Sequence, residues 1–168
     1  MAQLQDTFEN LMRQYERFFT ITQPHVFDDE EILAYAYFTQ HVEKYLLVRR
    51  AKMYGIETNE HVFVVHVPKL DASVWEREKA RIVVAEKDYV KPHAEHMYSF
   101  MTLVLLCDTI DAGVKKEIQR LRSTKYYKAT IHGYSAVRVA AIDLGTEEII
   151  LSRQAKDIHK VMYQALHM

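Results

Sequence analysis

The stretch Pro92-His-Ala-Glu-His-Met-Tyr-Ser-Phe-Met-Thr-Leu-Val-Leu-Leu-Cys107 decides the fold of this chain. It begins with ionisable residues and continues as an almost unbroken apolar run, with turn-forming residues on both sides. A short apolar run between turn signals is typical of a strand that is buried on both faces. The sequence therefore predicts a strand over 97–107 in the middle of a sheet. The ionisable residues at its start are His93, Glu95 and His96.

The composition is that of an ordinary globular protein. The chain has 168 residues, of which 49% are hydrophobic and 27% charged, and this size suits one domain over residues 1–168. The formal net charge of −1 gives no overall attraction to nucleic acid or to anionic membranes. We find neither an apolar run of the roughly 18 residues that cross a bilayer nor a secretory signal. The single cysteine, Cys107, favours a reducing cytoplasm and a buried thiol.

Four segments carry helix signals, which are apolar residues three or four positions apart and polar caps. The first helix starts at Leu4 and should end near Thr20 to Thr22, before Pro24. The other helices are expected over 73–89, from Asp111 onward and from about Gln154 onward.

Strand signals are strongest where β-branched and aromatic residues cluster between turn residues. Pro68 should stop one such run, and Gly133 marks a tight reversal between two others. Besides 97–107, the predicted strands are 61–67, 126–131, 134–142 and 147–151.

The segment from Asp28 to Gly55 allows two interpretations on its residues alone. Acidic residues at its start, basic residues near its end and the final glycine favour one helix. Its aromatic and branched residues, interrupted by a polar break at 41–44, favour a hairpin with strands over 31–39 and 45–55.

Three motifs resemble a family of short, functionally uncharacterised bacterial proteins that are common in anaerobic Gram-positive bacteria. The motifs are Pro92-His-Ala-Glu-His-Met-Tyr-Ser99, His132-Gly-Tyr-Ser-Ala-Val-Arg-Val-Ala-Ala-Ile-Asp-Leu144, and Lys44-Tyr45 with Glu57-Thr-Asn-Glu-His61. The resemblance extends from about residue 30 to the end of the chain. It implies strands for 31–55, but it implies no activity and no catalytic residues.

The expected order of elements is α-βββ-α-β-α-βββ-α. This order predicts an α+β fold with one mixed, mainly antiparallel sheet of about six to seven strands and four helices packed on it.

A candidate polar site follows from this topology. If helix 73–89 is a crossover, strands 60–67 and 97–107 are parallel and start at the same edge of the sheet. The residues that would then gather are Glu57, Glu60, His93, Glu95 and His96. Imidazoles and carboxylates together suit zinc or manganese, with His93, His96 and Glu60 as the ligands. Glu and His before a strand also serve as caps and turn residues. We therefore predict no cofactor, with a divalent metal as the alternative.

A second candidate is a basic patch that could bind phosphate groups. Tyr126 and Tyr127 lie within it and could stack on bases, although the neutral net charge argues against nucleic acid as the partner. The patch consists of Lys115, Lys116, Arg120, Arg122, Lys125 and Lys128.

Common catalytic motifs are absent from the sequence. There is no GxGxxG, no P-loop and no Gly-x-Ser-x-Gly. The predicted order of helices and strands resembles the core of restriction endonucleases, but the Glu-x-Lys motif of those enzymes is missing from the matching strand. We therefore predict a non-enzymatic cytoplasmic binding domain that interacts with itself as a homodimer or with another protein, through exposed strand edges, and not with a membrane. The alternative is a metal-dependent hydrolase of the nuclease type that uses the candidate polar site.

Overall fold

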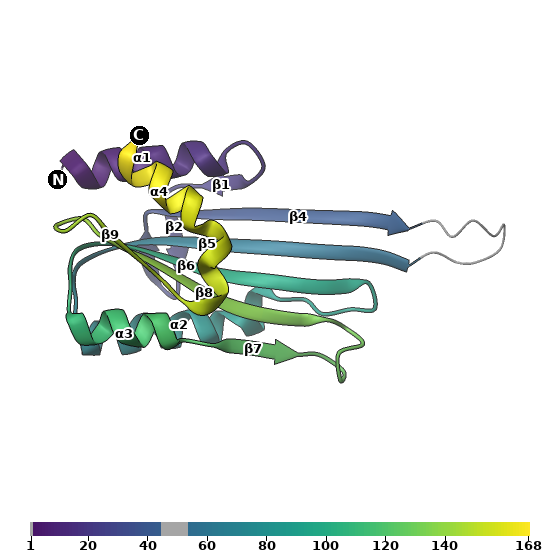
Figure 1. The fold of residues 1–168 in the computed structure, drawn as a ribbon. Helices are drawn as coiled ribbons and strands as arrows, with labels where there is room; N and C mark the ends of the chain where they lie inside the picture. Colours follow the sequence, from purple (N-terminus) through teal and green to yellow (C-terminus); the bar gives the residue numbers. More distant parts are fainter. Residues whose placement is uncertain (1, 45–53) are drawn as a thin grey trace.

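The computed structural model describes residues 2–44 and 54–168. The four α-helices are α1 (Ala2–Tyr15), α2 (Ala72–Tyr89), α3 (Ala112–Arg120) and α4 (His159–His167), and a 3-10 helix, η1 (Arg153–Ile158), precedes α4. The strands are β1 (Thr20–Thr22), β2 (His25–Phe27), β3 (Glu30–Ile32), β4 (Ala34–Lys44), β5 (Tyr54–Leu70), β6 (His96–Ile110), β7 (Ser123–Tyr126), β8 (Tyr134–Asp143) and β9 (Glu148–Leu151). Figure 1 shows the helices on both faces of the sheet.

One seven-stranded sheet organises the structure. Its strand order is β1-β4-β5-β6-β8-β7, with β9 also paired to β8, and β2 and β3 form a separate hairpin. The β5–β6 and β6–β8 pairs are parallel, and the other four pairs in the sheet are antiparallel. The predicted α+β fold with a mixed, mainly antiparallel sheet and four helices is therefore confirmed. Within this sheet, β1, β4 and β5 precede α2, and β7, β8 and β9 follow α3. The predicted strands 31–39 and 61–67 correspond to parts of β4 and β5, whereas β1 was not predicted as a strand.

The predicted central strand is β6. It lies between β5 and β8, and residues 101–107 are buried on both faces. Helix α2 connects β5 to β6, so it is the crossover that makes these two strands parallel.

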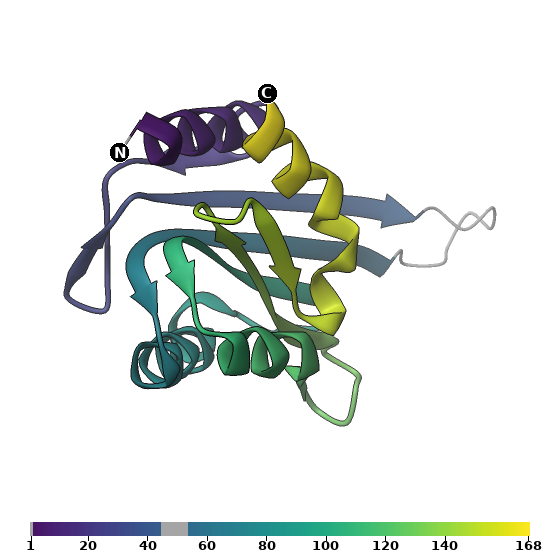
Figure 2. The ribbon, with the colours of Figure 1, turned by 60° about the vertical axis from the view of Figure 1, so that its left-hand side comes forward.

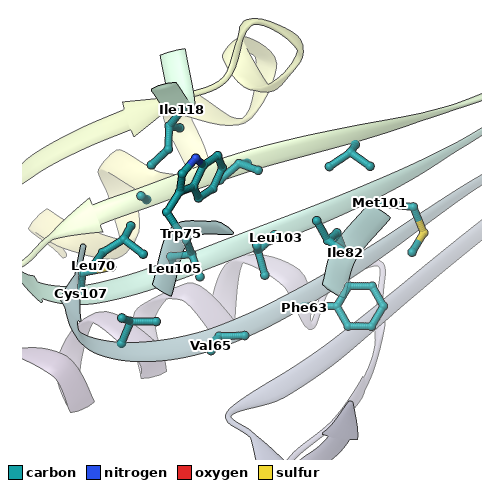
Figure 3. Close-up of a cluster of buried hydrophobic side chains, with 14 of the residues drawn as sticks. Phe63, Val65, Leu70, Trp75, Ile82, Met101, Leu103, Leu105, Cys107 and Ile118 are labelled. Atoms are coloured by element: carbon teal, nitrogen blue, oxygen red, sulfur yellow. The ribbon is translucent and has the colours of Figure 1, made fainter. Parts of the chain in front are cut away.

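Each face of the sheet carries its own hydrophobic core. On one face, Trp75 and Ile82 from α2 and Ile118 from α3 form a cluster with residues of β5 and β6 such as Phe63 and Leu103. Figure 3 shows Ile82 close to Phe63 and Trp75 close to Leu105. On the other face, α1 and α4 cover the alternate residues of the same strands, such as Val62 and Val104. The period-2 alternation of side chains explains how one strand supplies both cores.

Several predicted boundaries were wrong, because pairing in the sheet overrides local signals. Helix α1 ends at Tyr15, and Thr20–Thr22 instead pairs with the edge of β4 as β1. The polar residues 41–44 belong to β4 and not to a turn, and most of the predicted strand 45–55 lies outside the described residues. Strand β5 continues past Pro68 to Leu70. In this part β5 pairs with β6 on one side, and its other side is unpaired because the pairing with β4 ends at Val64. A proline is tolerated on such an unpaired side.

The predicted strand 126–131 is also wrong, because β7 ends at Tyr126 and a turn over 127–133 follows. This turn lies at the end of the sheet where β5, β6 and β8 begin. We call this region the open end, formed by the starts of these three strands, the ends of β4 and β7, and the turn. Strands β4 and β5 extend here well beyond the helices (Figures 1 and 2). Among the described residues, no helix combines the length and apolar character needed to cross a membrane.

Candidate functional site

The parallel pairing of β5 and β6 brings the side chains of two predicted site residues, Glu57 and His93, into contact. Glu57 is the register partner of His96, and its backbone N–H donates to the carbonyl oxygen of Glu95 at 2.8 Å. Its carboxylate Oε2 lies 3.1 Å from Nε2 of His93. The Nδ1 atom of His93 accepts a backbone hydrogen bond from Glu95, so Nε2 carries the proton and donates to Glu57.

Further side chains extend this contact into a hydrogen-bonded chain. The amide of Asn59 donates to Oε1 of Glu57 at 2.9 Å, and the hydroxyl of Tyr37 donates to the side-chain oxygen of Asn59 at 3.0 Å. Burial raises the pKa of Glu57, but the hydrogen bonds from Asn59 and His93 outweigh it, so the pKa lies below its usual range. Glu57 is thus held as a carboxylate.

His96 is buried and makes two hydrogen bonds of its own. Its Nδ1 lies 2.7 Å from the carbonyl oxygen of His132, and its Nε2 lies 2.8 Å from the hydroxyl of Ser99. A carbonyl can only accept, so Nδ1 donates and Nε2 accepts from Ser99. Both ring nitrogens are therefore satisfied inside the protein.

Glu60 does not belong to this cluster, because it lies on the opposite face of the sheet. Its Oε2 accepts from Nη2 of Arg138 at 3.1 Å. The guanidinium of Arg138 also donates to Asp157 at 2.8 Å and to Thr102 at 3.1 Å, and its side chain is only 1% exposed. The sheet therefore separates Glu60 from His93 and His96, the other two predicted metal ligands.

The remaining site residue, Glu95, folds toward β4. Its Oε2 lies 3.7 Å from Nε2 of His41, which is too long for a hydrogen bond. Across residues 2–44 and 54–168, no group of three or more His, Cys, Asp or Glu side chains is arranged to hold a metal ion.

The basic patch is partly neutralised by nearby carboxylates. Nζ of Lys115 lies 2.6 Å from Glu148 and 3.3 Å from Asp143. Lys125 lies over the ring of Tyr127, at 5.5 Å from its centroid. The other four cations are exposed on α3, on the segment after it and on the turn: Lys116, Arg120, Arg122 and Lys128.

A cavity of about 340 Å³ lies at the open end. Its walls include Ile56, Glu95 and Tyr134. Three further wall residues are large apolar side chains that face solvent: Met97 is 49% exposed, Tyr126 62% and Ile131 74%. We call these six residues the rim: Ile56, Glu95, Met97, Tyr126, Ile131 and Tyr134.

The turn that carries Ile131 has an unusual backbone. Lys128, Ala129 and Thr130 have φ values of 44°, 48° and 79°, in the left-handed region that non-glycine residues rarely adopt. Gly133, with φ of 71°, packs on the start of β6, where a Cβ would collide with the carbonyl oxygen of Met97. The close approach of Gly133 and the His96 hydrogen bond together fix the turn against β6. Strained backbone of this kind is concentrated at functional sites.

Aromatic rings continue the rim onto the face of the sheet. The ring of Tyr134 lies 6.0 Å from that of Tyr126 and 5.9 Å from that of Tyr98, whose own ring lies 4.5 Å from Phe100. Phe100 in turn packs against the guanidinium of Arg138, 4.2 Å from its ring centroid. The open end thus presents a continuous apolar and aromatic surface.

Residues 3–164 match the family model of a domain of unknown function (DUF8052). The chain belongs to this family. The match confirms the expected resemblance to a family without an assigned activity, while the bacterial source of that family stays a prediction. No curated protein and no solved structure matches the chain.

The exposure of Met97 and Ile131 does not follow from the sequence pattern. Met97 belongs to the apolar run that predicts a buried strand, and Ile131 is the last residue of the predicted strand 126–131. The available signal was the position of Ile131 directly before His132-Gly133, where a turn exposes apolar side chains.

Proposed function

We propose that this protein is a non-enzymatic protein-binding domain that recognises its partner with the open end of its sheet. The observation that carries the proposal is the group of three exposed apolar side chains, Met97, Tyr126 and Ile131, around one cavity. Exposed apolar side chains that occur singly need no explanation, whereas a contiguous patch marks an interaction surface.

The rigidity of the open end supports this proposal. The turn over 127–133 closes through hydrogen bonds between Tyr127 and Gly133 and between His132 and Tyr127. Left-handed backbone at Lys128 to Thr130 costs about 1–3 kcal/mol per residue, so the surrounding contacts must hold it. A pre-formed surface loses little conformational entropy on binding, which favours affinity.

The charges near the rim favour protein over nucleic acid as the partner. The cavity wall carries the carboxylate of Glu95, and the neighbouring Arg138 is already paired with Glu60 and Asp157. Carboxylates repel phosphates, and Lys115 of the basic patch is paired with Glu148 and Asp143. Lys116 and Arg120 lie on α3, away from the rim, which leaves Lys128 as the cation on the turn itself. Aromatic side chains and methionine are enriched at protein interfaces.

A second copy of the chain is one partner that fits this proposal. Strand β1 covers only Tyr35–Tyr37 of β4, so residues 38–44 have no strand on that side within the described part of the chain. An uncovered edge of this kind can pair with a strand of another molecule. The single buried Cys107 supports a reducing, cytoplasmic environment for this interaction.

The alternative function, a metal-dependent hydrolase, has one specific observation in its favour. Glu57 and His93 lie in contact, and Glu95 and His41 lie close by. Glu57 is engaged by Asn59 and His93, His96 by Ser99 and His132, and Glu60 faces the other side of the sheet. Because these side chains already have partners, we favour the binding function.

Two measurements test the binding function. The full-length protein is used to select ligands from a displayed peptide library, and its molar mass is measured by light scattering over a concentration series. We expect either selected peptides whose binding shifts the NMR signals of Met97 and Ile131, or a dimer that Ile131→Asp dissociates.

A strict monomer that selects no peptide would contradict the proposal. So would binding that shifts only signals outside the open end, or binding to anionic vesicles that Ile131→Asp abolishes while no peptide binds.

A further inference from the structure

The cavity at the open end combines apolar walls with one ionised side chain. Ile56, Met97, Tyr126, Ile131 and Tyr134 form the apolar part of the rim. Among the described residues that line the cavity, Glu95 and His96 are the acidic and basic ones. A group bound here would meet hydrocarbon surface and a carboxylate together.

The position of Glu95 depends on a glycine. Gly55 has no side chain, and a Cβ there would lie 2.6 Å from the carboxyl carbon of Glu95 and 2.7 Å from its Oε2. Gly55 therefore lets this carboxylate fold down at the mouth of the cavity, beside the backbone of β5.

The carboxylate of Glu95 is not engaged by a strong cation among the described residues. Its one ion pair there is with the imidazole of His41, at 3.7 Å. His93, two residues before it, uses its Nε2 on Glu57, and His96 is satisfied by Ser99 and His132. Glu95 is about half exposed, so it is free to accept hydrogen bonds from an incoming donor.

Given binding at the open end as proposed above, we infer that the bound segment of the partner carries a lysine or arginine directly next to a large apolar residue. The apolar side chain enters the cavity and contacts Met97, Tyr126 and Ile131. The cation lies at the mouth and pairs with Glu95. A cavity of about 340 Å³ is at the lower end of the size range of ligand sites, which suits one side chain and its neighbour.

The same arrangement disfavours other ligands. An acidic residue or a phosphate next to the apolar group would face the carboxylate of Glu95 at close range. A polar residue in place of the apolar one would leave Met97 and Ile131 in contact with water.

Three hexapeptides with blocked termini test this inference on the full-length protein: Gly-Ser-Leu-Lys-Ser-Gly, Gly-Ser-Leu-Glu-Ser-Gly and Gly-Ser-Ser-Lys-Ser-Gly. NMR titration gives the dissociation constant of each and the residues whose signals shift. We expect the Leu-Lys peptide to shift Met97 and Ile131 and to bind about two- to fivefold more tightly than the Leu-Glu peptide, as an exposed ion pair allows. The Ser-Lys peptide should bind more weakly still.

The variant Glu95→Gln separates charge from shape. This variant should bind the Leu-Lys and Leu-Glu peptides equally. Added salt should likewise reduce the preference of the wild type for the Leu-Lys peptide, because it screens the charge of Glu95. If the wild type binds both leucine peptides equally at the rim, the cation preference is wrong while binding at the open end stands. If none of the three peptides shifts rim signals, or if the Leu-Glu peptide binds more tightly, the inference is overturned.

Discussion

His96 and His132 are joined by a hydrogen bond of 2.7 Å, from Nδ1 of the buried imidazole to a backbone carbonyl oxygen. This bond links the start of the central strand to the turn that presents Ile131. A buried residue at the start of the central strand thus helps to hold the surface turn in place.

His96→Ala is therefore expected to loosen the turn as well as to destabilise the protein. Loss of a buried hydrogen-bonded side chain leaves the hydroxyl of Ser99 without its partner and should lower the free energy of unfolding by about 1–3 kcal/mol. Urea unfolding gives this value, and amide exchange of residues 128–133 reports the turn. His93→Ala is the matched control, since His93 is partly exposed and its hydrogen bonds are to Glu57 and Glu95 instead of to the turn. Equal exchange rates in the two variants would show that His96 does not hold the turn.

Arg138 is expected to stabilise the fold mainly by neutralising Glu60. Burial raises the pKa of Glu60, so removal of its cationic partner leaves a costly carboxylate. Arg138→Met should lower the free energy of unfolding at neutral pH by about 3 kcal/mol. Asp157→Asn should cost less than about 1 kcal/mol, because Asp157 is exposed.

The double variant Arg138→Met with Glu60→Gln tests the cause of that loss. It should be more stable than Arg138→Met alone, because the unpaired charge is gone. A double variant as unstable as the single one would indicate that lost packing of Arg138, and not charge, is responsible.

His61 should make the protein less stable as the pH falls. Burial lowers the pKa of His61 from 6.5 to about 4, while its Nδ1 lies 2.7 Å from the hydroxyl of Tyr35. Between these pH values the unfolded chain binds a proton that the folded chain does not. The stability contributed by His61 is thus present above pH 6.5 and is lost progressively toward pH 4, by up to about 3 kcal/mol.

Denaturant unfolding at a series of pH values measures this effect in the wild type and in His61→Gln. The difference in stability between the two should shrink as the pH falls through this window. A constant difference from pH 7 to pH 4 would contradict it.

Cys107 should be unreactive in the folded protein. The side chain is fully buried in the core under α2 and α3, and burial raises the pKa of its thiol, so the reactive thiolate is scarce. A thiol-specific reagent such as Ellman's reagent should modify it only after unfolding in urea. Rapid modification under native conditions would mean that this core opens readily.

The sequence predicted the parts of this structure in which local pattern and burial agree. The apolar run 97–107 specified the central strand, and the crossover helix placed Glu57 next to the segment 93–96. Glu57 and Glu60 point to opposite faces because they lie three residues apart in one strand. This was missed because the predicted strand began only at residue 60 or 61, whereas β5 begins at Tyr54. The left-handed turn was missed because Lys128, Ala129 and Thr130 carry no glycine signal. Tertiary contacts at His96 and Gly133 hold it.

The most direct test of the central claim compares two substitutions of exposed aliphatic residues by aspartate. Ile131 lies on the rim, whereas Val26, 64% exposed on β2, lies outside it. The dissociation constant is measured for the selected peptide, or for the dimer if the protein self-associates. We predict that Ile131→Asp weakens binding by about tenfold or more, because an aliphatic side chain that becomes buried in the complex is lost, while Val26→Asp leaves binding unchanged. Equal affinity of Ile131→Asp and the wild type, with both folded, would contradict the assignment of the open end as the binding surface.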